Sequence, residues 1–439
     1  MTSRGLLSPE RALPAAAGAL VGFAVAQGPT LGLLGLVAAG VGLLGLLHPP
    51  VLTAYMFLGV LFDRIGATGS KLGDFPITAS KLAVLGGLGI WGARCLLVRG
   101  PVVRWHPVLW AMLGIVVMTA TSIAIANCMY VGKYDLAGMA MMTVMVALVY
   151  TILAEARLLG LYRLLAVVLL AIFLLSLAPG ASERGSGTFG DPNEWATTVL
   201  LLTPTLLGGI APDRHPLARP LRVLILLLAP LVVLRSGSRS AFAVGLLVVP
   251  GCAWLLRRRP RELAVAAVAA AVAVPLVLRR STTLERLRQL LGNLEGTAIV
   301  PDNSLGERSE LFQQGVDLFR SHWLLGSGPG TFSTATGFLS TTGEFRPAHN
   351  TYLEIAAEQG VVGLIPFAVF TLVLARTLVR AYRASGEPTS RSRVLGLALG
   401  LTAVVLMAAT LGLLTFSIVY LVLGLALAVT TQAQRSHAA

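Results

Sequence analysis

The longest polar stretch of the chain, residues 279–350, holds many of the side chains that could do chemistry. It ends at His349 and Asn350, where an apolar run begins. Histidine is the side chain best suited to accept a proton near neutral pH, so His349 is a candidate general base. A lone histidine before a helix can equally have a structural role, and the residues alone leave both interpretations open.

Three arginines are candidates for binding an anion. Arg235 and Arg239 flank a very short connection between two apolar runs, and Arg308 lies in the long polar stretch. Charges near a membrane are costly and often mark function, and guanidinium groups bind phosphate oxygens in a bidentate manner. The structural alternatives are contacts of Arg235 and Arg239 with lipid phosphates and an ion pair of Arg308 with a nearby acidic residue.

A further polar cluster precedes another apolar run. Asp191, Asn193 and Glu194 follow the glycine-containing segment 185–190, and Pro192 lies among them, as at the start of a helix. Helix capping explains Asp191 and Asn193. A role in lining a substrate site is the alternative that we retain.

The composition places these residues in a membrane protein. Of the 439 residues, 55% are hydrophobic and only 12% are charged, and the mean hydropathy is +0.79. Soluble domains are less apolar, and the continuous apolar runs approach the ~20 residues with which a helix crosses a bilayer. The sequence therefore predicts an all-α, polytopic integral membrane protein. Cys95, Cys128 and Cys252 have no metal-ligand spacing, so neither a zinc site nor a disulfide framework is expected.

We predict about 12 to 14 transmembrane helices and one long extracytoplasmic (periplasmic) loop that contains helices. The expected parts are an N-terminal transmembrane bundle (1–278), the extracytoplasmic loop (279–350), C-terminal transmembrane helices (351–431) and a cytoplasmic tail (432–439). The candidate spans are 13–26, 31–47, 50–62, 78–98, 107–126, 136–153, 161–178, 194–211, 221–235, 239–256, 263–279, 351–375, 394–411 and 413–431.

The distribution of positive charge predicts the orientation. The net charge of +14 comes from arginines and lysines spread over many loops, which indicates topology rather than nucleic-acid binding. Cytoplasmic loops carry the excess of these residues. With both termini inside, the arginine-rich segments 257–261 and 376–393 are cytoplasmic, and the stretch 279–350 and the turn 236–238 face outside.

Four local predictions concern the long loop and the helix after it. Leucine spacing at 284–294 predicts a surface helix. A second helix is expected from Glu307 to Trp323, with Arg308 in its first turn, where a cation opposes the helix dipole. One face of this helix would carry Leu311, Phe312, Gly315, Phe319 and Trp323.

The segment 325–332 is rich in glycine but lacks the Gly-Lys-Ser/Thr of a P-loop, so it predicts a structural turn. The helix that begins after Asn350 is expected to run through Glu354, Glu358 and Gly360 into the next span.

Four pieces of sequence occur in a fixed order between residues 183 and 375. They are Gly-x-Phe-x-Asp-Pro-Asn at 187–193, Ser-Arg at 238–239, Arg308 followed by Leu-Leu-Gly-Ser-Gly-Pro-Gly at 324–330, and His-Asn-Thr-Tyr-Leu at 349–353 leading to Glu-Gln-Gly at 358–360. Together they resemble the O-antigen ligase and O-antigen polymerase superfamily of bacterial membrane glycan transferases.

The resemblance implies a glycosyltransferase of lipopolysaccharide or exopolysaccharide biosynthesis in the bacterial cytoplasmic (inner) membrane. Its donor would be an oligo- or polysaccharide on polyprenyl (undecaprenyl) diphosphate, and its acceptor a hydroxyl of the lipid A core, a growing glycan or a protein. His349 would take the acceptor's proton, and Arg239, supported by Arg235 and Arg308, would hold the diphosphate while the anomeric carbon inverts. The possible site-lining residues are Asp191, Asn193, Glu194, Arg346, Asn350 and Tyr352.

No cofactor and no nucleic acid are expected. A metal is not required, because arginines alone can stabilise a diphosphate leaving group, although Asp191 and Glu194 could bind one. The competing interpretation is a secondary transporter or lipid-linked-sugar flippase, which would place polar groups near the membrane midplane within repeated halves. Here the polar clusters gather at the outer ends of spans, and the sequence has no detectable internal repeat.

Overall fold

The computed structural model describes residues 44–45, 48–61, 71–72, 75–76, 79–98, 103–178, 191–210, 215–280, 303–336 and 348–438. Several predictions concern residues outside these ranges. They are the first predicted span, nearly all of the second, the surface helix at 284–294, the segment 185–190 and Arg346.

The described chain is almost entirely helical. Its elements before the long loop are α3 (Pro49–Leu61), β1 (Lys71–Leu72), β2 (Phe75–Pro76), α4 (Ala79–Val98), α5 (Pro107–Ala126), α6 (Met129–Leu153), α7 (Leu159–Leu177), α8 (Pro192–Ile210), α9 (Ala218–Ser236), α10 (Arg239–Leu255) and α11 (Pro260–Arg280). The remaining elements are α13 (Asn303–Ser321), α14 (Phe332–Thr336), α15 (Thr351–Ala384), α16 (Pro388–Met407) and α17 (Ser417–Ala438). The strands form one antiparallel pair of two residues each.

These elements confirm the all-α, polytopic membrane class. Among the described residues, six helices are long and apolar enough to cross a membrane, namely α5, α6, α7, α15, α16 and α17. The apolar helices α3 and α10 are shorter. The total number of spans and the division into a bundle, a loop and a C-terminal part stay predictions.

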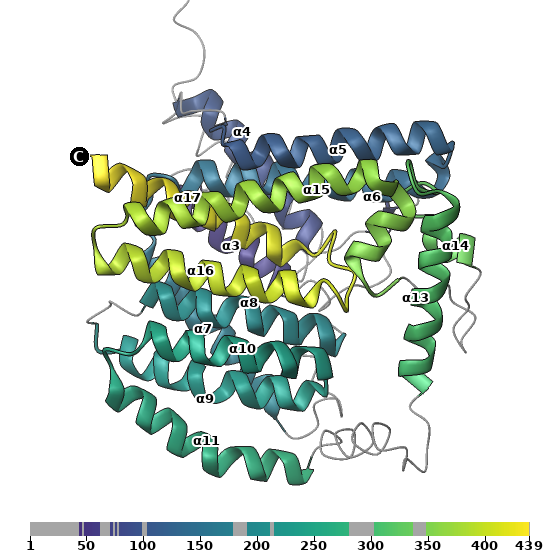
Figure 1. The fold of residues 1–439 in the computed structure, drawn as a ribbon. Coiled ribbons are helices and arrows are strands. Elements are labelled where there is room, and N and C mark those ends of the chain that lie inside the picture. Colours follow the sequence, from purple (N-terminus) through teal and green to yellow (C-terminus); the bar gives the residue numbers. More distant parts are fainter. Residues whose placement is uncertain are drawn as a thin grey trace, which may run out of the picture.

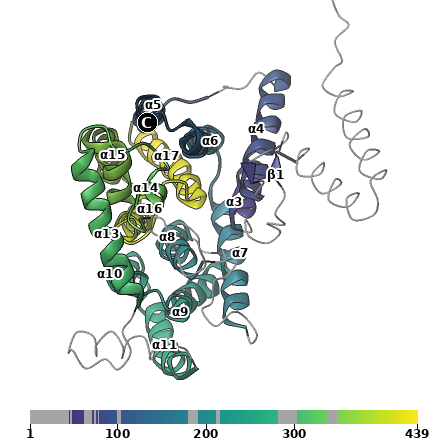
Figure 2. The same ribbon diagram turned by 90° about the vertical axis from the view of Figure 1, so that its right-hand side faces the viewer.

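Most of the long helices lie side by side, and Figure 2 looks nearly along many of them. Helix α13 is oriented differently: it lies across one end of the bundle, from the neighbourhood of α10 to that of α15 (Figures 1 and 2). Helices α8, α10 and α15 all begin at this end. It is the end that the charge distribution predicts to face outside.

Helices α8 and α16 approach each other closely through small residues. A Cβ atom on Gly208 would lie 2.5 Å from the carbonyl oxygen of Ser392, and one on Gly396 would lie 2.3 Å from that of Pro204. Small residues let the backbones of membrane helices come together, since lipid gives helices little hydrophobic reason to associate. This contact fixes α8 against α16 and the C-terminal helices.

A buried ion pair ties together three helices at the opposite end. The Arg222 guanidinium donates to both carboxylate oxygens of Glu262, at 2.7 and 2.8 Å, and to the carbonyl oxygen of Ile210 at 2.9 Å. Arg222 is only 1% exposed. A buried charge is tolerated when it is paired and fully hydrogen-bonded, so this triad connects the end of α8 with α9 and α11.

The structure corrects two predictions about α13. The helix begins at Asn303, so Arg308 lies in its second turn, and the argument from the helix dipole is wrong. The helix ends at Ser321, which leaves Trp323 outside it and 57% exposed, and Phe312 is 51% exposed. The face that packs inward carries the predicted Leu311 and Gly315, together with Leu318.

Candidate functional site

The start of α15 is anchored on both sides of His349. On one side, Ala348 is buried in a small cluster with Leu311, Phe332 and Ala357. On the other side, Asn350 caps the helix, because its Oδ1 atom accepts hydrogen bonds from the backbone N–H groups of Tyr352 and Leu353 at 3.1 Å each.

Thr351 adds a second anchor to the same helix start. Its backbone N–H donates to the carbonyl oxygen of Ala408, and its hydroxyl donates to that of Leu411 at 2.7 Å. The hydroxyl oxygen also accepts from the N–H of Leu413 at 2.9 Å. These contacts attach the start of α15 to the turn between α16 and α17.

Between these anchors, the backbone of His349 has a φ of 49°. This left-handed conformation is uncommon for residues other than glycine, and it persists only where the surroundings enforce it. Such conformations cluster at functional sites. The conformation therefore marks His349 independently of its side-chain chemistry.

The glycine-rich segment 324–330 fits into a break in α15. The helix is interrupted at Gly360, whose φ and ψ are 65° and −164°. The freed N–H groups of Val361 and Val362 donate to the carbonyl oxygens of Trp323 and Leu324, at 2.9 and 3.2 Å. The predicted structural turn is thus a backbone bridge, and the prediction of an uninterrupted helix through Gly360 is wrong.

Hydrogen bonds also run in the opposite direction, from N–H groups of the glycine-rich segment to carbonyl oxygens of α15. The N–H groups of Ser327 and Gly328 donate to the carbonyl oxygens of Ala357 and Glu358, at 2.9 and 2.8 Å. The Glu358 side chain, 4% exposed, accepts from the N–H of Phe332 at 2.9 Å and so holds the start of α14. The first turns of α15, before the break, are therefore a separately fixed platform.

A cavity of about 270 Å³ lies beside this platform and is lined by His349. Its other lining residues come from the starts of α6 and α8, from the glycine-rich segment, from α15 and from the turn between α16 and α17. They are Asp135, Met139, Asp191, Asn193, Glu194, Pro329, Glu354, Glu358, Gln359, Leu411, Gly412, Leu414 and Thr415. The cavity thus joins one histidine with five carboxylic acids.

At the start of α8, capping and cavity lining coincide. The Oδ1 atom of Asp191 accepts from the N–H groups of Asn193 and Glu194, at 2.6 and 3.3 Å. The predicted helix cap is therefore present, and Asp191, Asn193 and Glu194 also line the cavity. Their role in a substrate site stays a prediction.

The three candidate arginines lie outside this cavity in the described part of the chain. Arg239 is the first residue of α10, which Ser238 caps by accepting from the N–H of Ala241 at 3.4 Å. Arg235 donates to the carbonyl oxygen of Leu177 at 3.0 Å and so binds the end of α7. Arg308 is half-buried in α13.

Asn350 and Tyr352 have structural contacts. The Tyr352 hydroxyl donates to the carbonyl oxygen of Val405 at 2.6 Å, and its ring meets that of Phe367 edge to face. Asn350 is the helix cap described above. Neither Asn350 nor Tyr352 is among the described residues that line the cavity.

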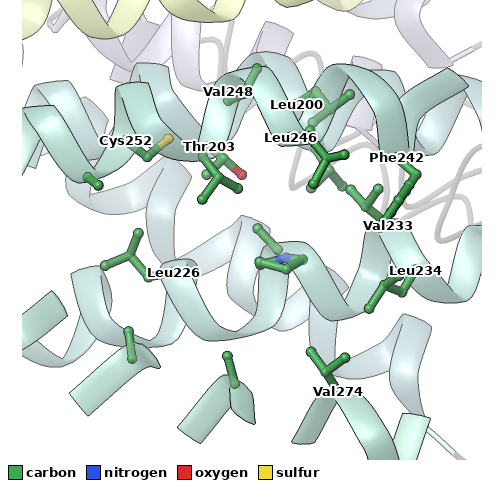
Figure 3. A pocket seen from close by; sticks show the side chains of 18 of the residues that line it. Leu200, Thr203, Leu226, Val233, Leu234, Phe242, Leu246, Val248, Cys252 and Val274 are labelled. Atoms are coloured by element: carbon green, nitrogen blue, oxygen red, sulfur yellow. The ribbon is translucent and has the colours of Figure 1, made fainter. Parts of the chain in front are cut away.

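A second, larger cavity of about 570 Å³ lies within the bundle, between α8, α9, α10 and α11. Figure 3 shows that side chains such as Leu200, Leu226, Val233 and Leu246 face it from several helices. Nearly all of its lining is aliphatic or aromatic. Leu234 and Phe242, which line it, lie next to Arg235 and within one turn of Arg239 in the chain.

The described residues contain no group of three or more His, Cys, Asp or Glu side chains with the geometry to hold a metal ion.

Comparison with known families decides how these features are interpreted. Residues 224–368 match the O-antigen ligase family. The match includes Arg235, Arg239, Arg308 and His349, and it confirms the resemblance to the O-antigen ligase and polymerase superfamily. No curated protein sequence matches the chain.

The O-antigen ligase match supports membrane glycan transfer in general as the activity of this multi-pass protein. Its range ends after the break in α15 and so covers the start of that helix with its histidine. Asp191 and its neighbours lie before the matched range, and only the structure brings them to the same cavity as His349.

Sequence reasoning did not select Asp135, Glu354 and Glu358 as site residues. A signal was present: each is an acid at or near the start of an apolar helical run, and ionisable residues in such runs usually face the protein interior. Their convergence could not be predicted, because it depends on how α6 and α15 pack.

Proposed function

We propose that this protein transfers a glycan from polyprenyl diphosphate to a hydroxyl acceptor at the outer face of the bacterial cytoplasmic membrane, with both termini inside. The observation that carries the proposal is His349, held in a left-handed conformation at the wall of a polar cavity. A residue that is kept in a strained conformation by its neighbours is expected to serve function.

In this proposal Arg239 is the main ligand of the donor diphosphate. It opens α10, so the N-terminal N–H groups of that helix and the guanidinium are offered to the same anion. Arg308 contributes from α13, whose first turns lie near α10 (Figures 1 and 2). Arg235, which also binds the end of α7, supports the turn.

The apolar cavity of Figure 3 is suited to the polyprenyl chain of the donor. It lies inside the bundle, and its lining residues Leu234 and Phe242 adjoin the two arginines of the turn. A lipid chain there would leave its diphosphate beside Arg235 and Arg239. Burial of apolar surface would supply affinity, at about 25 cal/mol per Å².

The reaction is a single displacement at the anomeric carbon. His349 accepts the proton of the acceptor hydroxyl while that oxygen forms the new glycosidic bond. The bond from the anomeric carbon to the diphosphate oxygen breaks, and the diphosphate leaves with the electron pair. The arginines stabilise its charge, so no metal takes part, and the anomeric configuration inverts.

The acceptor hydroxyl belongs to the lipid A core in a ligase, to a lipid-linked repeat unit in a polymerase, or to a protein in an O-glycosylating enzyme. The products distinguish these cases. Lengthening chains on polyprenyl diphosphate indicate a polymerase, and glycan on the lipid A core indicates a ligase.

The test uses purified protein in lipid vesicles with a polyprenyl diphosphate glycan and each acceptor, with and without a chelator. We expect His349→Ala to lower the transfer rate about 10²- to 10⁴-fold, as for loss of a general base. Arg239→Ala should lower it about 10²-fold or more, through loss of leaving-group stabilisation. A chelator should have no effect.

Two residues on the same outer side serve as controls. His322 and Arg320 are exposed and lie in or directly after the end of α13. His322→Ala and Arg320→Ala should transfer glycan at the wild-type rate. Full transfer by both His349→Ala and Arg239→Ala would refute the proposed mechanism.

A further inference from the structure

The carboxylic acids around the cavity differ in their hydrogen-bond partners. Asp191 caps α8, and Glu358 accepts from the N–H of Phe332. Glu354 is different: its Oε2 atom is buried, and no donor among the described residues bonds to it. Buried polar oxygens are normally hydrogen-bonded, so an unpaired one that lines a cavity needs an explanation.

The position of Glu354 explains how the protein tolerates a buried carboxylate oxygen without a hydrogen-bond donor. The residue lies in the first turn of α15, where a carboxylate interacts favourably with the helix dipole. It is fixed against the turn between α16 and α17, because a Cβ atom on Gly412 would lie 3.2 Å from its Oε2 atom. Glu354 lies in the helix that Asn350 caps, and His349 directly precedes this cap.

The chemistry of the wall limits what could pair with Glu354. A cavity lined by five carboxylic acids repels a phosphate or any other anion, and the arginines lie outside it. The acids line the cavity from α6, α8 and α15, so a ligand with several separated hydrogen-bond donors can bond to them. Sugar hydroxyls are such donors, and a volume of about 270 Å³ suits a small ligand.

We propose that the cavity is the subsite for the acceptor sugar, and that Glu354 positions this sugar by accepting a hydrogen bond from a hydroxyl next to the attacking one. The inference rests on the proposed function and adds to it that the acceptor is a sugar. Donor and acceptor are then separated by charge: the arginines outside hold the diphosphate, and the acidic cavity holds neutral hydroxyls close to His349.

The test measures binding without transfer, on the full chain in lipid nanodiscs. The two probes are the deacylated, dephosphorylated lipid A core oligosaccharide and the repeat-unit glycan released from its diphosphate. Glu354→Gln keeps the size of the side chain but replaces one acceptor by a donor. At least one probe should bind wild-type protein, and Glu354→Gln should weaken its binding about tenfold or more.

The matched control is Glu310→Gln, an exposed glutamate on α13, which should bind the probes like the wild type. Binding of the polyprenyl diphosphate donor should change less than about twofold in Glu354→Gln. Glu354→Asp, which keeps an acceptor, should bind the sugar better than Glu354→Gln. If Glu354→Gln loses folding stability, the comparison of Glu354→Asp with Glu354→Ala replaces it.

Three results would overturn the inference: failure of both sugars to bind wild-type protein, equal binding by wild type and Glu354→Gln, or an equal loss of donor and sugar binding. This assay measures binding alone, so its failure can be told apart from failure of the proposed function. If the proposed function failed, the protein would bind the sugar in this assay but would not transfer glycan from the diphosphate donor in the transfer assay.

Discussion

At the scale of single residues, His349 combines a proton acceptor with a backbone conformation that is uncommon for residues other than glycine. The sequence alone predicted the first property, since it placed the histidine where a loop predicted to lie outside meets a helix. It could not predict the second, because the conformation results from contacts of Ala348 and Thr351 with residues far away in the chain.

The strain at this position gives a prediction about stability. We compare His349→Gly with His349→Ala, both of which lack the imidazole and should have similarly lowered transfer rates. Glycine adopts a positive φ without steric cost, so His349→Gly should be more stable than His349→Ala by about 1 kcal/mol. Thermal or denaturant unfolding of the purified variants measures the difference. Equal stabilities would mean that the left-handed conformation is not enforced in solution.

At the scale of elements, the decisive feature is the break in α15. The sequence predicted one helix through Gly360, because the apolar run continues beyond it and a glycine within a helix is a weak signal. The break depends on Trp323 and Leu324, whose carbonyl oxygens accept hydrogen bonds from the freed N–H groups. The family motifs at 324–330 and 358–360 are themselves joined by the hydrogen bond from the N–H of Gly328 to the carbonyl oxygen of Glu358.

This contact can be tested at Gly360. Its φ and ψ lie in a region that is essentially restricted to glycine, and a Cβ atom would lie 2.3 Å from the carbonyl oxygen of Leu324. Gly360→Ala should therefore lower the free energy of unfolding by about 2 kcal/mol or more. It should also reduce transfer, since the platform that carries Glu354 would shift.

Gly386→Ala is the matched control for this substitution. No heavy atom lies within 4 Å of a Cβ atom built at Gly386, so this variant should fold and transfer glycan like the wild type. A Gly360→Ala protein with wild-type stability would show that the helix continues unbroken through this position.

At the scale of the whole molecule, the sequence predicted the helices much better than their contacts. The predicted span 107–126 coincides with α5 (Pro107–Ala126), because the run of apolar residues marks the helix directly. The predicted span 351–375 lies within α15, and the helix itself continues to Ala384 through arginines that it can carry beyond the membrane. The approach of α6, α8 and α15 around one cavity depends on packing and could not be predicted.

Orientation in the membrane is the remaining prediction at this scale, and it follows from charge. Ala335, exposed on α14, belongs to the loop predicted to lie outside, and Gly386 belongs to the arginine-rich connection predicted to lie inside. In a chain whose three cysteines are replaced by serine, a membrane-impermeant thiol reagent should label Ala335→Cys in intact cells. It should label Gly386→Cys only after permeabilisation.

Removal of the native cysteines matters because Cys128 lies near the outer segment, with its Sγ atom 3.7 Å from the carbonyl oxygen of Pro329. Burial raises the pKa of this thiol, so its thiolate is scarce at neutral pH and labelling would be slow but not zero. The reverse labelling pattern would place His349 and the arginines on the cytoplasmic side. Transfer from a donor at the outer face would then be impossible, and the proposed function would fail as a whole.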